Sequence, residues 1–157
     1  MGVNTLIYRQ CMPVPIERAW DFFSSPDNLA RITPPEMLFR IAGGAIDRQI
    51  HEGMRITYTL YPFMMLPVRW ETGITRVEKP FLFEDRQLSG PYESWRHLHL
   101  FHEIPEGVEM TDRIDYIMPM GIFGDLVNAL IVSRRLDEVF SYRKRKTGEI
   151  LGEMNCS

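Results

Sequence analysis

Six short strand-like runs, each closed by glycine or proline, fill the middle of this sequence and leave few architectures open to it. The runs are Leu38–Ala42, Met54–Tyr61, Arg69–Glu78, Phe81–Leu88, Ser94–Ile104 and Val108–Met118. The breaks between them are Gly43-Gly44, Pro62, Pro67, Lys79-Pro80, Gly90-Pro91 and Pro105-Glu106-Gly107. Such short intervals suit neighbouring antiparallel strands, because parallel strands need a long crossover connection. The sequence therefore predicts an antiparallel meander.

The segment before the meander predicts one strand followed by two short helices. Asn4–Met12 alternates like a strand. Pro15 then stands where a helix can begin, and the apolar residues from Ile16 to Phe23 follow helical spacing. A second short helix is predicted over Asp27–Arg31, ended by the prolines at 34 and 35.

A long helix is predicted after the meander, from about Ile122 to Lys146, with Gly148 as its stop. Its apolar stripe comprises Ile122, Leu126, Leu130, Leu136, Val139 and Phe140. The first half, "GIFGDLVNALIV", is apolar on most sides, so we expect the sheet to cover it. The last turns, "YRKRK", are basic, and we expect them to form a solvated face.

A sheet with one apolar face needs a second layer to cover that face, and the long helix is available for this. We therefore predict an α+β fold, in which a curved antiparallel sheet of about seven strands wraps around a long C-terminal helix. Two short helices follow the first strand. At 157 residues the chain suits a single domain spanning residues 1–157.

Composition narrows the classes of partner. The net charge of −3 argues against a nucleic-acid partner, and no apolar run is long enough for stable membrane insertion. The opening "MGVNTLIYRQ" lacks the apolar core of a signal peptide, which predicts a cytoplasmic protein. Cys11 and Cys156 lie near opposite ends and form no CxxC pair, so we interpret them as free thiols in a reducing compartment.

The order of elements, together with three local phrases, resembles the START-like, helix-grip superfamily (SRPBCC). This superfamily includes birch-pollen-allergen-like proteins and polyketide cyclase/dehydrase-like proteins. The phrases are "VPIERAWDFFSSPDNLARITPP", "FEDRQLSGPYESWRHLHLFHEI" and "MTDRIDYIMPMGIFGDL", and the last two resemble a bacterial ligand-binding subfamily. The resemblance covers nearly the whole chain. It implies an apolar cavity between the concave sheet face and the long helix. Known members bind lipids, sterols, plant hormones or polyketides there; some catalyse cyclisation or dehydration, and many only carry a ligand.

Alternate residues of the run Ser94–Ile104 carry aromatic and titratable side chains on one face, namely Trp95, His97, His99 and Phe101. Tight turns on either side would place Asp85 opposite His97 and Asp112 opposite His99. A carboxylate facing an imidazole fixes its tautomer and favours its charged form. The hypothesis is a cavity lined by this face, with the hydrogen-bonded pairs His97–Asp85 and His99–Asp112.

These considerations predict a protein that binds or carries a hydrophobic or amphipathic small molecule, such as a lipid, a polyketide or an isoprenoid-like compound. The predicted apolar wall consists of Tyr58, Trp70, Trp95, Phe101, Met110, Leu126 and Leu130. The predicted polar end consists of Asp85, Gln87, His97, His99, Asp112 and Tyr116. No metal and no organic cofactor are predicted, and the sequence does not fix the oligomeric state.

Other interpretations stay open at this point. An acid–base cyclase or dehydratase would use His97, Asp85, His99 and Asp112 as its catalytic groups, although no nucleophile stands in an activating motif. A metal on the His-x-His pair, with Asp85 or Asp112 as third ligand, is weighed and not adopted. The histidine–aspartate pairs could also simply hold the sheet together. Finally, the apolar tip Phe63–Leu66 suits the pocket mouth, a membrane contact or a regulatory partner.

Overall fold

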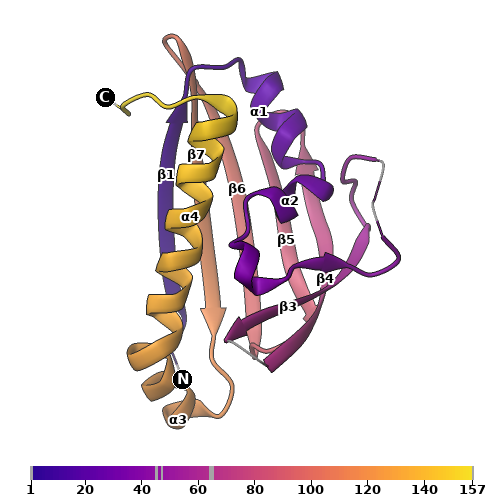
Figure 1. Ribbon diagram of the computed structural model, residues 1–157, viewed down its shortest axis with the longest axis vertical. Coiled ribbons are helices and arrows are strands. Elements are labelled where there is room, and N and C mark those ends of the chain that lie inside the picture. Colours follow the sequence, from indigo (N-terminus) through magenta and orange to yellow (C-terminus); the bar gives the residue numbers. More distant parts are fainter. Residues whose placement is uncertain (1, 45, 47, 64–65, 157) are drawn as a thin grey trace.

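The computed structural model describes residues 2–44, 46, 48–63 and 66–156. Its sheet has seven antiparallel strands in the order β1-β7-β6-β5-β4-β3-β2 (Figure 1). The strands are β1 (Asn4–Met12), β2 (Arg40–Ile41), β3 (Arg55–Phe63), β4 (Leu66–Glu78), β5 (Leu82–Ser89), β6 (Ser94–Ile104) and β7 (Gly107–Ile117). The helices are α1 (Ile16–Phe23), α2 (Asp27–Arg31), the 3-10 turn η1 (Pro35–Met37), α3 (Gly121–Val127), the π-helical turn η2 (Asn128–Val132) and α4 (Ser133–Leu151). The predicted α+β helix-grip fold is confirmed.

Two groups of helices cover the concave face of the sheet (Figure 1). The long helix α4 runs along β1 and β7, while α1 and α2 lie over β5 and β6. Under α1, the ring of Trp20 meets Phe83 and Phe101 edge-on, with ring centroids 5.6 and 5.7 Å apart. Because Trp20 is almost fully buried there, this end of the sheet is a packed core.

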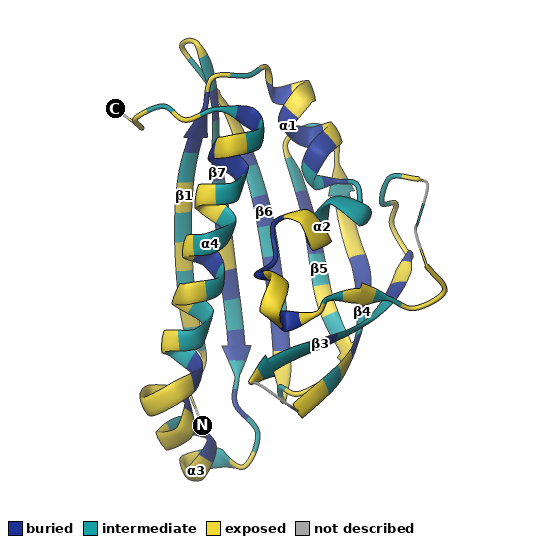
Figure 2. Ribbon diagram, in the orientation of Figure 1, coloured by how far each residue is buried: buried dark blue, intermediate teal, exposed yellow. Residues whose placement is uncertain are grey.

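Strand β6 confirms the predicted alternation. Trp95, His97, His99 and Phe101 are all buried, whereas the residues between them are partly exposed (Figure 2). The backbone register is also as predicted, because Asp85 on β5 pairs with His97, and Asp112 on β7 pairs with His99. Short turns fix this register, and a slip of one residue would have turned the aromatic face toward solvent.

Pro62 and Pro67 were predicted to separate two strands, but neither proline ends a strand. They lie inside β3 and β4, whose hairpin reaches Phe63 and Leu66. The pairing of the two strands shifts register between Leu60 and Phe63, and an irregular stretch of this kind tolerates a residue without an amide hydrogen. Met64 and Met65, at the predicted apolar tip, lie outside the described residues.

The C-terminal helix is longer than predicted. It begins at Gly121 and continues through η2 to Leu151, so Gly148 is an interior residue and not the stop. Gly152 ends the helix with a φ of 94°, in the left-handed region that favours glycine. The chain then reverses, and the amide of Met154 donates to the carbonyl of Cys11 at 3.3 Å.

The prediction that the sheet covers the first half of this helix is wrong. Leu126 and Leu130 are 59% and 68% exposed, and the buried residues there are Gly124, Asn128 and Val132, spaced by four. A Cβ on Gly124 would meet the carbonyl oxygen of Pro119 at 1.8 Å, so the helix packs here through its smallest residue. A small residue and a polar residue thus occupy the inner face, and the apolar stripe turns outward. Within the described parts of the chain, no helix combines the length and the apolar character needed to cross a bilayer.

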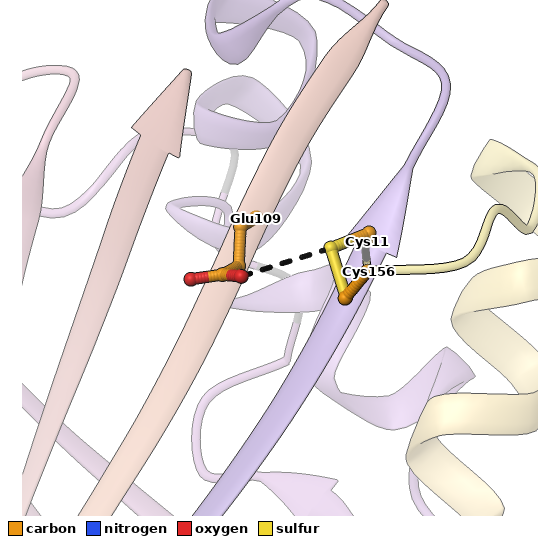
Figure 3. A group of neighbouring side chains, drawn as sticks. All are labelled: Cys11, Glu109 and Cys156. Atoms are coloured by element: carbon orange, nitrogen blue, oxygen red, sulfur yellow. Dashed lines mark hydrogen bonds between the residues drawn. A yellow bond between two sulfur atoms is a disulfide. The ribbon is translucent and has the colours of Figure 1, made fainter. Parts of the chain in front are cut away.

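Cys11 and Cys156 are not free thiols, which corrects the prediction from sequence. They form a disulfide with Cα atoms 5.4 Å apart, beside the carboxylate of Glu109, whose Oε2 lies 4.0 Å from Cys11 Sγ (Figure 3). The two residues are 145 positions apart in the chain, so only the fold brings them within bonding geometry. The bond ties the C-terminal segment to β1.

Candidate functional site

A cavity of about 420 Å³ lies between the concave sheet face and α4. Its lining is mostly apolar and aromatic, with contributions from Tyr58, Trp70, Ile74 and Trp95 on the strands, from Leu136, Val139 and Phe140 on α4, and from Phe23, Ile32 and Met37 near α1 and η1. Phe63 and Leu66, which are 38% and 67% exposed, also border it, so the cavity approaches the surface at the β3–β4 hairpin. The volume falls in the range of small-molecule sites.

A few charged or titratable groups interrupt this apolar wall, among them Asp85, His97, His99 and Arg143. The two imidazole rings stack with centroids 3.7 Å apart, and the ring of His99 stacks on Phe83 at 3.9 Å. Strand β6 places both histidines on one face because they are two residues apart. Asp85, His97 and His99 therefore lie together on one part of the cavity wall.

The hydrogen bonds of the two histidines exchange the predicted partners. His97 Nε2 donates to Asp112 Oδ1 at 2.7 Å, and His99 Nε2 donates to Asp85 Oδ2 at 2.8 Å. The predicted pairs His97–Asp85 and His99–Asp112 are opposite each other in the backbone register, yet the bonds run along the diagonals. Strand twist brings diagonal side chains together, and Phe83 occupies the position directly opposite His99 on β5.

The pKa values of the two histidines move in opposite directions. Burial, together with the neighbouring charge of His99, lowers the pKa of His97 below its ordinary value, and this outweighs Asp112 and Asp85. For His99 burial acts in the same direction, but hydrogen bonding and attraction to Asp112 and Asp85 outweigh it and raise the pKa. Of the two stacked imidazoles, His99 therefore keeps its proton to a higher pH than His97 does.

Both carboxylates stay ionised in this environment. Burial alone would raise the pKa of Asp112, but the hydrogen bond from His97 and the nearby charge of His99 hold it well below the usual range of a carboxyl group. Asp85 follows the same pattern, with His99 as its hydrogen-bond donor and a lowered pKa. Asp112 Oδ1 also lies 3.3 Å from His99 Nδ1, as an ion pair. The arrangement can hold charge, orient a polar group or exchange a proton.

Six of the residues predicted from sequence border the cavity, namely Tyr58, Trp70, Asp85, Trp95, His97 and His99. Asp112 is not part of the cavity lining, but its carboxylate contacts both histidines. Among the predicted wall residues, Leu126 and Leu130 correct the prediction most clearly, because they face outward. Phe101 and Met110 belong to the packed core under α1 and do not line the cavity.

Two predicted polar residues serve the fold instead of bordering the cavity. Gln87 closes the β5–β6 turn, where its side chain donates to the carbonyl of Tyr92 at 2.8 Å and accepts from the amide of Tyr92 at 3.2 Å. The hydroxyl of Tyr116 donates to Asn128 Oδ1 at 2.6 Å and so anchors the helix to the sheet.

Arg143 is a charged cavity residue that sequence reasoning missed, because it lies in the basic segment interpreted as a solvated face. The sequence did contain a pattern that indicates an inward-facing Arg143. Arg143 follows Val139 by four residues and Phe140 by three, so it continues the apolar stripe of the helix. A basic residue on the apolar face of a helix indicates a charge that faces inward.

Two clusters in the described residues have the spacing of metal ligands. Potential ligand atoms of Asp85, His97 and His99 lie within 4.8 Å of one another, as do those of Cys11, Glu109 and Cys156. In the first cluster the imidazole Nε2 atoms already donate to carboxylates. In the second, the disulfide uses both sulfur atoms. The expectation of no metal stays a prediction.

Comparisons with known proteins support the fold. No protein-family model matches the chain, and no curated protein matches it in sequence. Among solved structures, it is similar to protein Ms6760 from Mycobacterium smegmatis, with a TM-score of 0.68, 18% identity and 96% of each chain covered. It is also similar to protein CV1439 from Chromobacterium violaceum, with a TM-score of 0.73, 9% identity and coverage of 96% of this chain and 99% of that one.

A plant protein shares the same architecture. The ginseng major latex-like protein 151 from Panax ginseng aligns with a TM-score of 0.68 and 12% identity, covering 95% of this chain and 97% of that one. At identities this low, the likeness shows the helix-grip fold alone.

Proposed function

We propose that this helix-grip chain binds or carries a hydrophobic or amphipathic small molecule in the cavity between its sheet and α4. The observation that carries the proposal is the cavity itself, which has a mostly apolar wall and a few charged or titratable side chains. Sites of this kind use the apolar wall for affinity and the few polar groups for orientation. Lipids, polyketides and isoprenoid-like compounds fit this description.

The proposed site combines an apolar wall around Trp70 and Trp95 with a polar end at His97 and His99. We propose that residues 1–157 act as one START-like binding domain that needs no metal, organic cofactor or nucleic acid. The cytoplasmic location stays a prediction. One of its two grounds was the interpretation of Cys11 and Cys156 as free thiols. The disulfide removes that ground, because such bonds persist mainly in oxidising compartments.

Native mass spectrometry of freshly purified protein tests the proposal directly, with an organic extract analysed in parallel. The expected result is a stoichiometric small apolar molecule, or uptake of one when candidate compounds are added. A protein that stays empty and takes up none of a panel of lipids, isoprenoids and polyketides would contradict the proposal.

Filling the cavity gives the first mutational prediction. Val139 borders the cavity from α4, so Val139→Trp should place an indole in the space that a ligand would occupy. We expect at least tenfold weaker ligand binding, measured by isothermal titration calorimetry, because the contacts in the cavity are lost. Ser141→Trp, an exposed position on the same helix, is the matched control and should bind as the wild type does. Equal binding by both variants would place the ligand elsewhere.

A second candidate function is acid–base catalysis by a cyclase or dehydratase. It is favoured by two stacked histidines whose pKa values move in opposite directions, since such pairs can divide the roles of acid and base. The variant His97→Gln should then lose turnover of a polyketide-like substrate while still binding it. Turnover that survives this substitution would exclude the role for His97. The proposed role of the hairpin tip at Phe63 and Leu66 in a regulatory contact stays a prediction.

A further inference from the structure

Arg143 carries a charge on the cavity wall that no neighbour neutralises through direct contact. Its Nε atom is buried without a hydrogen-bond partner. Within the described part of the chain, its guanidinium makes no hydrogen bond or ion pair, and its one ring contact places Cζ 4.6 Å from the centroid of Phe140. The side chain as a whole is partly buried, and a cation held largely out of water without a partner is costly, so a group left in this state indicates a binding partner that the chain itself does not supply.

The neighbouring carboxylates are engaged elsewhere. Asp85 accepts from His99 and Asp112 accepts from His97, so the imidazoles use them. Both are near enough to support the charge of Arg143 electrostatically, since they counter the lowering of its pKa by burial. Neither is close enough to form an ion pair with it. The donors of Arg143 therefore remain available to an acceptor on a molecule in the cavity.

A second unused donor borders the same cavity. Trp70 Nε1 is buried and has no hydrogen-bond partner. An indole nitrogen can only donate, as can every nitrogen of a guanidinium. Two unused obligatory donors favour a ligand with hydrogen-bond acceptors and disfavour a pure hydrocarbon.

We propose that the ligand is a carboxylic acid with an apolar body, and that Arg143 binds its carboxylate. This inference rests on the proposed binding function and names the chemical class of the ligand. The planar guanidinium matches the two oxygens of a carboxylate, and a charge-assisted pair of this kind is stronger than a neutral hydrogen bond. Trp70 supplies a further donor for a second acceptor on the ligand. The apolar body would occupy the aromatic wall.

A matched pair of ligands tests this proposal. Decanoic acid and 1-decanol share a ten-carbon chain and differ in the head group, and calorimetry at pH 7.5 gives both affinities. We expect wild-type protein to bind the acid at least about tenfold more tightly than the alcohol, as expected for charge-assisted hydrogen bonds. Arg143→Met should bind the two ligands equally. The control Arg145→Met removes an exposed arginine, stacked on Tyr142 of the same helix, and should keep the preference.

The outcomes separate this proposal from the function on which it rests. Equal binding of acid and alcohol by the wild type would overturn the carboxylate assignment and leave the cavity function standing. Binding of neither ligand would count against both. A preference that survives in Arg143→Met would assign the carboxylate to another residue. If that variant fails to fold, Arg143→Lys is the alternative, because it keeps the charge but lacks the paired donors of a guanidinium. We expect this variant to show a reduced preference for the acid. An unchanged preference would overturn the bidentate contact.

Discussion

Replacing Cys156 by serine should lower the free energy of unfolding by about 3–5 kcal/mol under oxidising conditions. The bond closes a loop between residues 145 positions apart, and long loops gain the most from closure because the unfolded chain loses the most freedom. Cys156 is exposed, so the substitution changes little packing. The whole effect should therefore come from the lost covalent bond.

Urea unfolding of wild type and Cys156→Ser, each with and without dithiothreitol, measures this effect. The wild type should fall to the stability of the variant once it is reduced, whereas the variant should not respond to the reductant. Equal stability of the two oxidised proteins would contradict the expectation. A response of the variant to dithiothreitol would trace the effect to something other than this bond.

Asp112→Ala is the second substitution with a large expected effect. It removes the acceptor of His97 Nε2 and the charge beside His99, both of them buried. Removing one partner from a buried charged network typically lowers the free energy of unfolding by about 3–5 kcal/mol, and we expect a decrease of that size here. Asp115→Ala is the control on the same strand. The carboxylate of Asp115 bonds Thr5 and Arg113 at the surface, where such pairs contribute about 1 kcal/mol or less.

The pH dependence of that difference identifies its origin. The lowered pKa of Asp112 means that its contribution is present above the ordinary carboxyl pKa of about 4 and is lost as pH falls through the folded value. The raised pKa of His99 means that its contribution is present below about 6.5 and is lost as pH rises through the folded value. The gap between wild type and Asp112→Ala should therefore be largest near pH 5. A gap that does not vary between pH 3 and pH 9 would indicate lost packing alone.

The sequence predicted the strands well because their determinants are local. Alternation along Ser94–Ile104 and short turns on both sides were enough to place Asp85 across from His97. The hydrogen-bond partners were not predictable in this way, because strand twist and the bulk of Phe83 decide which diagonal each imidazole takes. Backbone register is a property of neighbouring residues, while side-chain pairing depends on the whole sheet.

Most of the other wrong predictions concern residues of the long C-terminal helix. Hydrophobic spacing placed Leu126 and Leu130 inside, but the small side of Gly124 and the polar side of Asn128 pack there instead. The same emphasis on hydrophobic residues kept Arg143 out of the predicted site. A stripe defined only by apolar residues overlooks positions where close approach or a buried charge matters more. The disulfide was equally hidden, because sequence spacing alone says nothing about residues at opposite ends of the chain.

The placement of the three tryptophans has an optical consequence. Trp70 and Trp95 border the cavity with ring centroids 5.1 Å apart, whereas Trp20 is enclosed in the packed core under α1. Filling or emptying the cavity should change the surroundings of the first pair, whereas Trp20 does not border the cavity. Fluorescence emission from Trp70 and Trp95 is consequently a built-in signal of occupancy, with Trp20 as its constant background. The protein therefore contains an intrinsic fluorescent probe of cavity occupancy.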